Sequence, residues 1–424
     1  MQTCFVVLEP VNHVYKVIET AAARGLHVVV FHAAPLAVGG GYTKGFDAIG
    51  EFHRIGSWLD EEAALQSIHS HLDGRAVSGT YAAVETVLLV EATLREQLGL
   101  PSHGRAAIER LLDKRWVRRR LRETGLSRLG DANPREVTAG ATWPFEDRTA
   151  YLKPITGGGS VHVTKCAGLE DVARGLREWD EEALSCRPIL RQHLRRGGDL
   201  FLEEEAKGEL MSLEGWVQDG RYRALGLTSR TVLARDPSVE MGATFPYDHP
   251  LRADIESKIG AIHAALGLVH GMTHAELMVS REGVVELVEL NVRFGGSDIL
   301  LMMNHAFGAA VDELLVDVAC GREPARVDFI CKGYACMQQL LAPPGTAVLE
   351  GIDLDRGLVL NSRLLKDAGS VLASTNYQGD HVATFMVYGD SYAEALENAR
   401  KVRSGARVNG TWIGEDCNND VVLR

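Results

Sequence analysis

The fold and chemistry of this chain are decided by the segment Gly271-Met-Thr-His-Ala-Glu276-Leu-Met-Val-Ser-Arg-Glu-Gly283-Val-Val-Glu-Leu-Val-Glu289-Leu-Asn291-Val-Arg293-Phe-Gly295-Gly296. It predicts two apolar strands joined by a tight turn at Arg281-Glu282-Gly283. Because side chains alternate between the faces of a strand, we expect one face to pack in the core, formed by Ala275, Leu277, Val279, Val284, Val288, Leu290 and Val292. The opposite face should then present Glu276, Glu289, Asn291 and Arg293 together.

The polar face of this hairpin is suited to a metal ion beside an anion. Two carboxylates and a carboxamide oxygen form an all-oxygen donor set of the kind that Mg²⁺ prefers. Arg293 would suit a phosphate or a carboxylate, and the following Gly295-Gly296 would let the backbone approach a ligand closely. A half-exposed hairpin with a solvated charged face is the alternative for this segment taken alone.

A glycine-rich turn lies upstream, in Tyr151-Leu-Lys153-Pro-Ile-Thr156-Gly157-Gly158-Gly159-Ser160-Val161-His-Val163. We expect a strand that ends near the lysine, a turn, and a second strand. Successive backbone N–H groups in such a turn can bind phosphate oxygens, with Lys153 adding charge and Thr156 and Ser160 adding hydroxyl donors. The segment lacks the P-loop order and the helix that follows a dinucleotide fingerprint, and an ordinary hairpin turn is the alternative.

Length and composition set the class of protein. The 424 residues suffice for two or three domains, and 46% hydrophobic with 24% charged residues is ordinary for a globular chain. The net charge of −12 argues against nucleic acid or an anionic membrane as a partner. The seven cysteines are scattered without CxxC spacing, which predicts free thiols. We see no signal peptide and no apolar run near the roughly 20 residues of a membrane span, so a cytoplasmic protein is expected.

The order of predicted elements indicates an α/β protein. Apolar runs at 3–8 and 27–31 flank a helix closed by Gly25, a βαβ opening typical of parallel sheet. A strand at 76–78 and a helix at about 83–98 extend it. We interpret the basic helix from Lys114 as solvated, with one functional cation, rather than as a nucleic-acid patch. The predicted domains are 1–104, 105–208 and 209–424, with a β-rich subdomain from about 329 that includes a helix at 392–402.

The acidic run from Glu203 to Glu209 joins the second predicted domain to the third. By itself it is typical of a solvated loop. Placed between two domains, it also fits a hinge that offers backbone groups to a purine edge and a carboxylate to ribose hydroxyls.

Taken together, these motifs resemble ATP-grasp carboxylate–amine ligases. Lys114, the Lys153 turn, the Glu203–Glu209 hinge and the Glu276–Arg293 hairpin occur in the order of that family, and the chain is most similar to L-amino-acid ligases that make dipeptides. The resemblance implies a Rossmann-like N-terminal domain, a small α+β lid over ATP, and a large C-terminal α+β domain. The hinge departs from the family pattern, because Glu205-Ala206 stands where an aromatic or large aliphatic residue is usual.

The resemblance also implies roles for individual residues. Lys114 and Lys153 would contact the nucleotide phosphates, under a mobile flap formed by Gly157, Gly158, Gly159, Ser160 and Val161. The adenine site would be lined by Glu203, Glu204 and Ala206, with Glu209 at the ribose. Two Mg²⁺ ions (or Mn²⁺) would bind Glu276, Glu289 and Asn291. Arg293 would stabilise the acyl phosphate, Gly295, Gly296 and Ser297 would border the acceptor pocket, and His274 would either help to deprotonate the amine or serve as a hydrogen-bonding histidine.

The expected reaction is ATP-dependent amide formation between a small carboxylate and an amine, both from amino acids, through an acyl phosphate, with release of ADP and phosphate. An alternative is a ligase of another carboxylate, of carboxylase or purine-pathway type, although no Met-Lys-Met biotin acceptor is present. A regulator that retains only nucleotide binding is disfavoured, because Lys153, Glu276, Glu289, Asn291 and Arg293 are all in place. Small molecules are the expected partners, and a homodimer is the family expectation.

Overall fold

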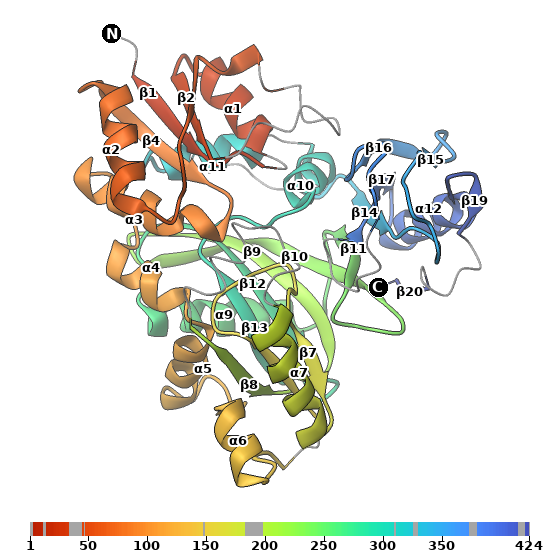
Figure 1. Cartoon of the computed structure of the whole chain (residues 1–424). Helices are drawn as coiled ribbons and strands as arrows, with labels where there is room; N and C mark the ends of the chain where they lie inside the picture. The colour runs from red at the N-terminus through yellow and green to blue at the C-terminus, as the bar shows by residue number, and fades with distance from the viewer. Residues whose placement is uncertain are drawn as a thin grey trace.

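The computed structural model describes residues 3–11, 14–33, 45, 47–146, 149–182, 198–308, 311–324, 330–372, 380–413 and 420–423. Within these ranges the strands form an N-terminal sheet, a small central sheet, a long sheet through the rest of the molecule, and a short sheet near the C-terminus (Figure 1). No helix in the described ranges is long and apolar enough to cross a membrane. Of the seven cysteines, Cys186 and Cys417 lie outside the described residues, and the other five are free thiols.

The N-terminal sheet is parallel, in the order β3-β2-β1-β4. Its strands are β1 (Cys4–Leu8), β2 (His27–His32), β3 (Glu51–Arg54) and β4 (Val77–Ala82). The connecting helices are α1 (Val14–Ala23) and α2 (Glu61–Leu72). Every residue of β1 is buried, as expected for a strand covered on both faces. The predicted βαβ opening is therefore present.

A group of short helices leads from this sheet to the small one. They are η2 (Glu85–Val87), α3 (Leu88–Gln97), α4 (Arg105–Leu111) and α5 (Lys114–Glu123). Asp113 begins α5, because its carboxylate accepts a hydrogen bond from the Trp116 N–H. This cap fixes the first turn of the helix, and Lys114 lies in that turn.

The small sheet is antiparallel, in the order β5-β8-β6-β7, and has its own apolar core. It contains β5 (Asp131–Ala132), β6 (Ala150–Pro154), β7 (Thr164–Cys166) and β8 (Leu200–Glu204), with α6 (Pro134–Gly140) and α7 (Leu169–Glu182). The second strand predicted after the glycine-rich turn begins at Thr164, beyond the end of the segment 151–163. Ser160 and His162 have φ angles of 55° and 56°, which are incompatible with a strand and extend the turn.

The long sheet runs in the order β13-β12-β9-β10-β11-β14-β17-β16, with β20 beside β10. Its strands are β9 (Glu209–Gln218), β10 (Arg221–Leu233), β11 (Glu240–Phe245), β12 (Gly271–Val279), β13 (Val285–Asn291), β14 (Tyr334–Leu340), β16 (Val359–Leu364), β17 (Ala383–Gly389) and β20 (Val421–Val422). The associated helices are α9 (Arg252–Leu266), α10 (Ile299–Phe307), α11 (Val311–Ala319) and α12 (Tyr392–Gly405).

The C-terminal strands extend this long sheet instead of forming a separate layer. β14 pairs with β11, and β17 pairs with β14, so the expected β-rich subdomain is continuous with the sheet that carries the hairpin. The short sheet consists of β15 (Ile352–Asp353), β18 (Arg407–Val408) and β19 (Thr411–Trp412). Phe329, where the subdomain was expected to begin, lies outside the described residues.

The β12–β13 hairpin contains an irregularity that regular alternation does not predict. Glu276 pairs with Glu289, but the next residue, Leu277, pairs with Leu287, so Val288 is an extra residue in the ladder. The alternation between core-facing and pocket-facing side chains in β13 therefore reverses at Val288. Residues 285 and 287 pack in the core, whereas Val284 is 42% exposed and Val288 lines a pocket, so the expectation that both would be core residues was wrong.

Candidate functional site

Two adjoining pockets lie over the polar face of the hairpin. The first, which we call the lid pocket, is enclosed by the small sheet, the glycine-rich turn and β12–β13. It brings together Lys114, Lys153, Gly157, Gly158, Ser160, Val161, Glu203, Glu204, Ala206, Glu276 and Glu289. Sequence reasoning missed its apolar wall, which includes Tyr151, Leu210, Met278 and Val288. An apolar wall beside cations and carboxylates fits the base and the phosphates of a nucleotide.

The second, which we call the sheet pocket, extends from the same carboxylates across the long sheet. Among the predicted residues it is lined by Gly158, Gly159, His274, Glu276, Glu289, Asn291, Arg293, Gly296 and Ser297. It also includes residues that the sequence did not single out, among them Glu85, Arg230, Glu240, Met337 and Gln339. The two pockets share Gly158, Glu240, Glu276 and Glu289, so a group transferred from one to the other would pass the two paired carboxylates.

Three predicted residues do not line either pocket. Glu209 precedes Leu210 on β9, and because consecutive side chains point to opposite faces, its carboxylate faces away and accepts a hydrogen bond of 2.9 Å from Tyr247 Oη. The Gly295 N–H donates to Glu214 Oε2 at 3.2 Å. Thr156 lies in the glycine-rich turn without lining either pocket. Because the Glu209 carboxylate faces away from both pockets, its position does not support the predicted contact with ribose.

The lysines of the lid pocket are held by carboxylates. Lys153 Nζ lies 2.5 Å from Glu203 Oε2, and Arg118 Nε donates to the other carboxylate oxygen at 2.7 Å. Burial would raise the pKa of Glu203, but the two cations outweigh it and hold the pKa below its ordinary value. Lys114 Nζ donates to the Gly157 carbonyl at 2.6 Å and lies 3.4 Å from Glu289 Oε1. Lys114 thus links the glycine-rich turn to the hairpin.

Glu276 and Glu289 face each other across the hairpin ladder. Burial raises the pKa of Glu289, and the charge of Glu276 raises it further. Two partly buried carboxylates that repel each other would be stabilised by a divalent cation beside them, and the Asn291 amide oxygen is a compatible third donor. In the described part of the chain, no three Asp, Glu, His or Cys side chains converge as a metal site. The two carboxylates and the amide oxygen are hard oxygen donors of the kind that Mg²⁺ prefers, and an ion held by them would need further ligands from phosphate oxygens or water.

His274 lies between two carboxylates. Its Nδ1 is 2.6 Å from Glu214 Oε1, and its Nε2 is 3.1 Å from Glu276 Oε1. Burial would lower the pKa of His274, but the two glutamates raise it to about 9. An imidazolium that donates from both nitrogens cannot accept a proton from an amine. The geometry therefore favours the hydrogen-bonding role over the proton-accepting one.

Arg293 is fixed by a residue from the N-terminal part of the chain. Its Nε donates to Glu85 Oε1 at 2.8 Å, Nη2 contacts the same oxygen, and Nη1 donates to the Phe294 carbonyl at 2.8 Å. Burial would lower the pKa of Arg293, but Glu85 raises it, so the guanidinium stays charged. Nothing in the sequence around Glu85 connects it to residues near 293, because the contact forms only when the sheets assemble.

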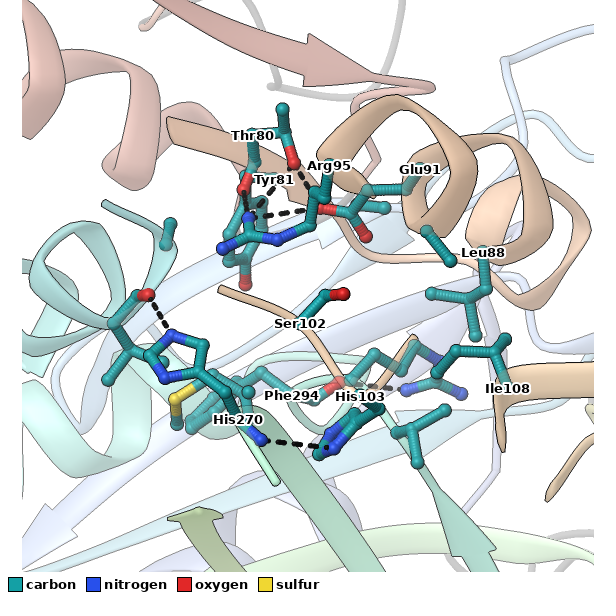
Figure 2. Close-up of a pocket in the computed structure, with 18 of the residues that line it drawn as sticks. Thr80, Tyr81, Leu88, Glu91, Arg95, Ser102, His103, Ile108, His270 and Phe294 are labelled. Atoms are coloured by element: carbon teal, nitrogen blue, oxygen red, sulfur yellow. Dashed lines mark hydrogen bonds and ion pairs between the residues drawn. The ribbon is translucent and has the colours of Figure 1, made fainter. Parts of the chain in front are cut away.

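A cavity lies behind Arg293, between the N-terminal part of the chain and β12 (Figure 2). Figure 2 shows Arg95 directed toward Thr80 and Glu91 on one side and His103 beside His270 on the other. Arg95 Nη1 donates to Thr80 Oγ1 at 3.0 Å, and the His270 N–H donates to His103 Nδ1 at 3.2 Å. These contacts lie around the cavity, and Arg293 is one of the residues that line it.

Comparisons with known proteins agree with this arrangement. Residues 149–300 match the ATP-grasp domain family. The alanine–anticapsin ligase of Bacillus amyloliquefaciens is 25% identical over 398 residues, which cover 83% of this chain and 81% of that protein. The L-amino acid ligase structure from Bacillus licheniformis is similar with a TM-score of 0.82 at 17% identity, covering 96% of this chain and 98% of that one.

A second solved structure shares the fold. The biotin carboxylase domain of the Hydrogenobacter thermophilus 2-oxoglutarate carboxylase, in complex with MgADP and bicarbonate, is similar with a TM-score of 0.70 at 15% identity, covering 96% of this chain and 91% of that one. The predicted fold class is confirmed.

Proposed function

Because this chain is an ATP-grasp protein, we propose that it joins the carboxylate of an L-amino acid to the amine of a second amino acid, converting ATP to ADP and phosphate. The observation that carries the proposal is the junction of the two pockets. A nucleotide in the lid pocket and an acid in the sheet pocket would meet at Glu276 and Glu289, with Arg293 beside them. The named activity of the Bacillus relatives supports the amino-acid substrates.

The residues present fit transfer through an acyl phosphate. A carboxylate oxygen of the acid would attack the γ-phosphorus of ATP, and ADP would leave. Two anions must meet in this step, and Lys114, Lys153 and Arg293 offset their repulsion. Mg²⁺, held by Glu276, Glu289 and Asn291, would neutralise phosphate charge when bound; two ions are expected, and Mn²⁺ is an alternative.

The amide would form in the second step. The amine nitrogen attacks the acyl carbon, the nitrogen loses a proton, and phosphate leaves with its electron pair. Arg293 would donate to the oxygen that becomes negatively charged, and Glu85 holds it in place for that role. The glycine-rich turn, tied to Lys114 through the Gly157 carbonyl, would exclude water from the acyl phosphate.

The test is phosphate release from ATP and Mg²⁺ over all pairs of the twenty amino acids, with products identified by mass spectrometry. We expect ADP and phosphate in equal amounts with a dipeptide for particular pairs. The absence of pair-dependent release would sink the dipeptide proposal and favour another carboxylate. Formation of AMP and pyrophosphate would contradict the acyl-phosphate route.

We also retain as proposals the homodimer and the division at residues 104 and 208, where the boundary at 104 separates regions of the chain that share a core and not independently folding units. The separate cores of the small sheet and the long sheet support the second boundary. Light scattering on the purified protein would measure its oligomeric state, and the expected result is a mass of two chains.

A further inference from the structure

Arg230 is one of the residues that line the sheet pocket. It is on β10, where it pairs with Ala243 of β11, which in turn pairs with Met337 of β14. All three residues line the sheet pocket. Arg230 is 4% exposed, so its guanidinium has been removed almost entirely from bulk water.

The hydrogen-bonding capacity of this guanidinium is not met by the described protein. Its Nε forms an ion pair with Glu240 Oε2 at 3.4 Å but has no hydrogen-bond partner. Its Nη2 lies 3.5 Å from His274 Nε2, a nitrogen that is already 3.1 Å from Glu276 Oε1. By contrast, Arg293 donates directly to a carboxylate.

A buried guanidinium in this state is suited to an anionic ligand. Burial of an arginine is costly when its donors are unmet, and a planar carboxylate can meet two of them at once. A spherical cation or a neutral amide would not meet that need. The adjoining Ala243, Ile299 and Met337 provide apolar surface for the rest of such a ligand.

The position of Arg230 selects which carboxylate it would bind. Although β9 separates β10 from β12, the Arg230 side chain reaches back toward Glu276: its Nη2 lies 3.5 Å from His274 Nε2, and that nitrogen lies 3.1 Å from Glu276 Oε1, a span that the amine and carboxylate of one α-amino acid can bridge. The acid that is phosphorylated must place its carboxylate near Glu276, Glu289 and Arg293. A second amino acid could direct its amine to that junction while its own carboxylate extends toward Arg230.

We propose that Arg230 binds the α-carboxylate of the amine substrate, so that this enzyme accepts a free amino acid and rejects simple amines and amino-acid amides. This inference rests on the proposed function and assigns the substrate class of its second step. Arg230 is thereby a specificity residue for the acceptor and has no part in forming the acyl phosphate.

The experiment compares two acceptors of the same acyl phosphate. Hydroxylamine traps an acyl phosphate as a hydroxamate and carries no carboxylate, whereas an amino acid carries one. We expect Arg230→Gln to retain hydroxamate formation while the KM for the amino-acid acceptor rises about 30-fold or more. Arg230→Lys should recover part of the loss, and Arg223→Gln, an ion-paired and exposed arginine on the same strand, serves as the control.

The outcomes separate this inference from the proposed function. Equal loss of hydroxamate and dipeptide in Arg230→Gln would overturn the acceptor role. Absence of hydroxamate in the wild type with every acid would instead overturn the proposed function.

Calorimetric titration with ADP, Mg²⁺ and amino acids or their carboxamides tests Arg230 without turnover. We expect the wild type to bind the free amino acids more tightly than their carboxamides, and Arg230→Gln to bind the two kinds of ligand about equally. A preference for the free acids in Arg230→Gln as large as that of the wild type would contradict the inference.

Discussion

At the scale of single residues, the site depends on how Arg293 is held. Arg293→Ala removes a donor to the oxygen that becomes negatively charged, and losses of ~10²–10³ in turnover are typical of such changes. We expect a loss of this size in dipeptide formation with a smaller change in nucleotide affinity. The kcat and a nucleotide-binding titration measure the two effects, and an equal fall in both would contradict the assignment.

Glu85 should act through Arg293. Glu85→Gln keeps the size of the side chain but weakens two hydrogen bonds to the guanidinium. We expect kcat to fall about tenfold while the KM for ATP is retained. Glu61→Gln, which alters another ion pair of the N-terminal region, is the control and should leave kcat unchanged. Steady-state kinetics on both variants check this, and a higher KM for ATP with an unchanged kcat would contradict a positioning role.

Buried histidines should make the fold sensitive to acid. Burial lowers the pKa of His263 to about 4, whereas in the unfolded chain the pKa is about 6.5. The unfolded state therefore binds more protons between these values, so stability is fully present above pH 6.5 and is lost as pH falls toward 4. This one group contributes on the order of 3 kcal/mol to that loss.

Urea unfolding at pH 7.5 and pH 4.5 measures this effect. His263→Gln should reduce the pH dependence, because the buried titrating group is removed. The exposed His69→Gln should not change it. An unchanged difference between the two pH values in His263→Gln would show that the acid sensitivity has another source.

At the scale of elements, the β12–β13 hairpin shows what the sequence could predict. The turn, the two strands and the polar face with Glu276 and Glu289 all follow from alternation and turn residues. The extra residue at Val288 does not, because valine suits either a core or a pocket position and periodicity assumes an unbroken register. Glu85 and Arg230 were missed for a different reason, since long-range packing alone places them beside the hairpin.

The irregular register predicts different effects at two neighbouring positions. Leu287→Ala should destabilise the protein by about 2–5 kcal/mol, because Leu287 is a buried core residue. Val288→Ala should cost less than about 1 kcal/mol and instead weaken nucleotide binding, because Val288 lines the lid pocket. Urea unfolding and nucleotide titration of both variants distinguish them, and equal destabilisation would refute the register.

At the scale of the whole molecule, the N-terminal sheet is not an independent body. Its inner face shares one apolar core with α10, α11 and the middle of the long sheet. Arg24 Nη1 also donates to Asp317 Oδ1 of α11 at 2.6 Å. The parallel sheet itself could be predicted from the apolar runs, but this attachment could not, because it joins residues far apart in the chain.

The shared core predicts the behaviour of a fragment. Residues 1–104 expressed alone would expose the apolar surface that α10 and α11 cover, so we expect the fragment to aggregate or lack a cooperative thermal transition. Circular dichroism during heating measures this. A cooperative unfolding transition of the soluble fragment would show that the first predicted domain folds independently.

The small sheet, with its separate core, should respond differently. Hydrogen exchange in residues 150–166 should be faster than in β9 and β12, and ATP with Mg²⁺ should slow it. Mass spectrometry of peptides from both regions checks this expectation. Identical exchange rates with and without nucleotide would contradict a lid that closes on ATP.

Gly158 lines both pockets, and this has a consequence for the order of events during turnover. A glycine-rich turn that moves as one unit would uncover both pockets together. Loading of all substrates would then precede closure of the turn, and closure would commit the bound acid to reaction. ADP and the product would be released after the turn opens once. Binding of ADP and binding of the product should therefore be coupled in product-inhibition experiments, and not independent of each other.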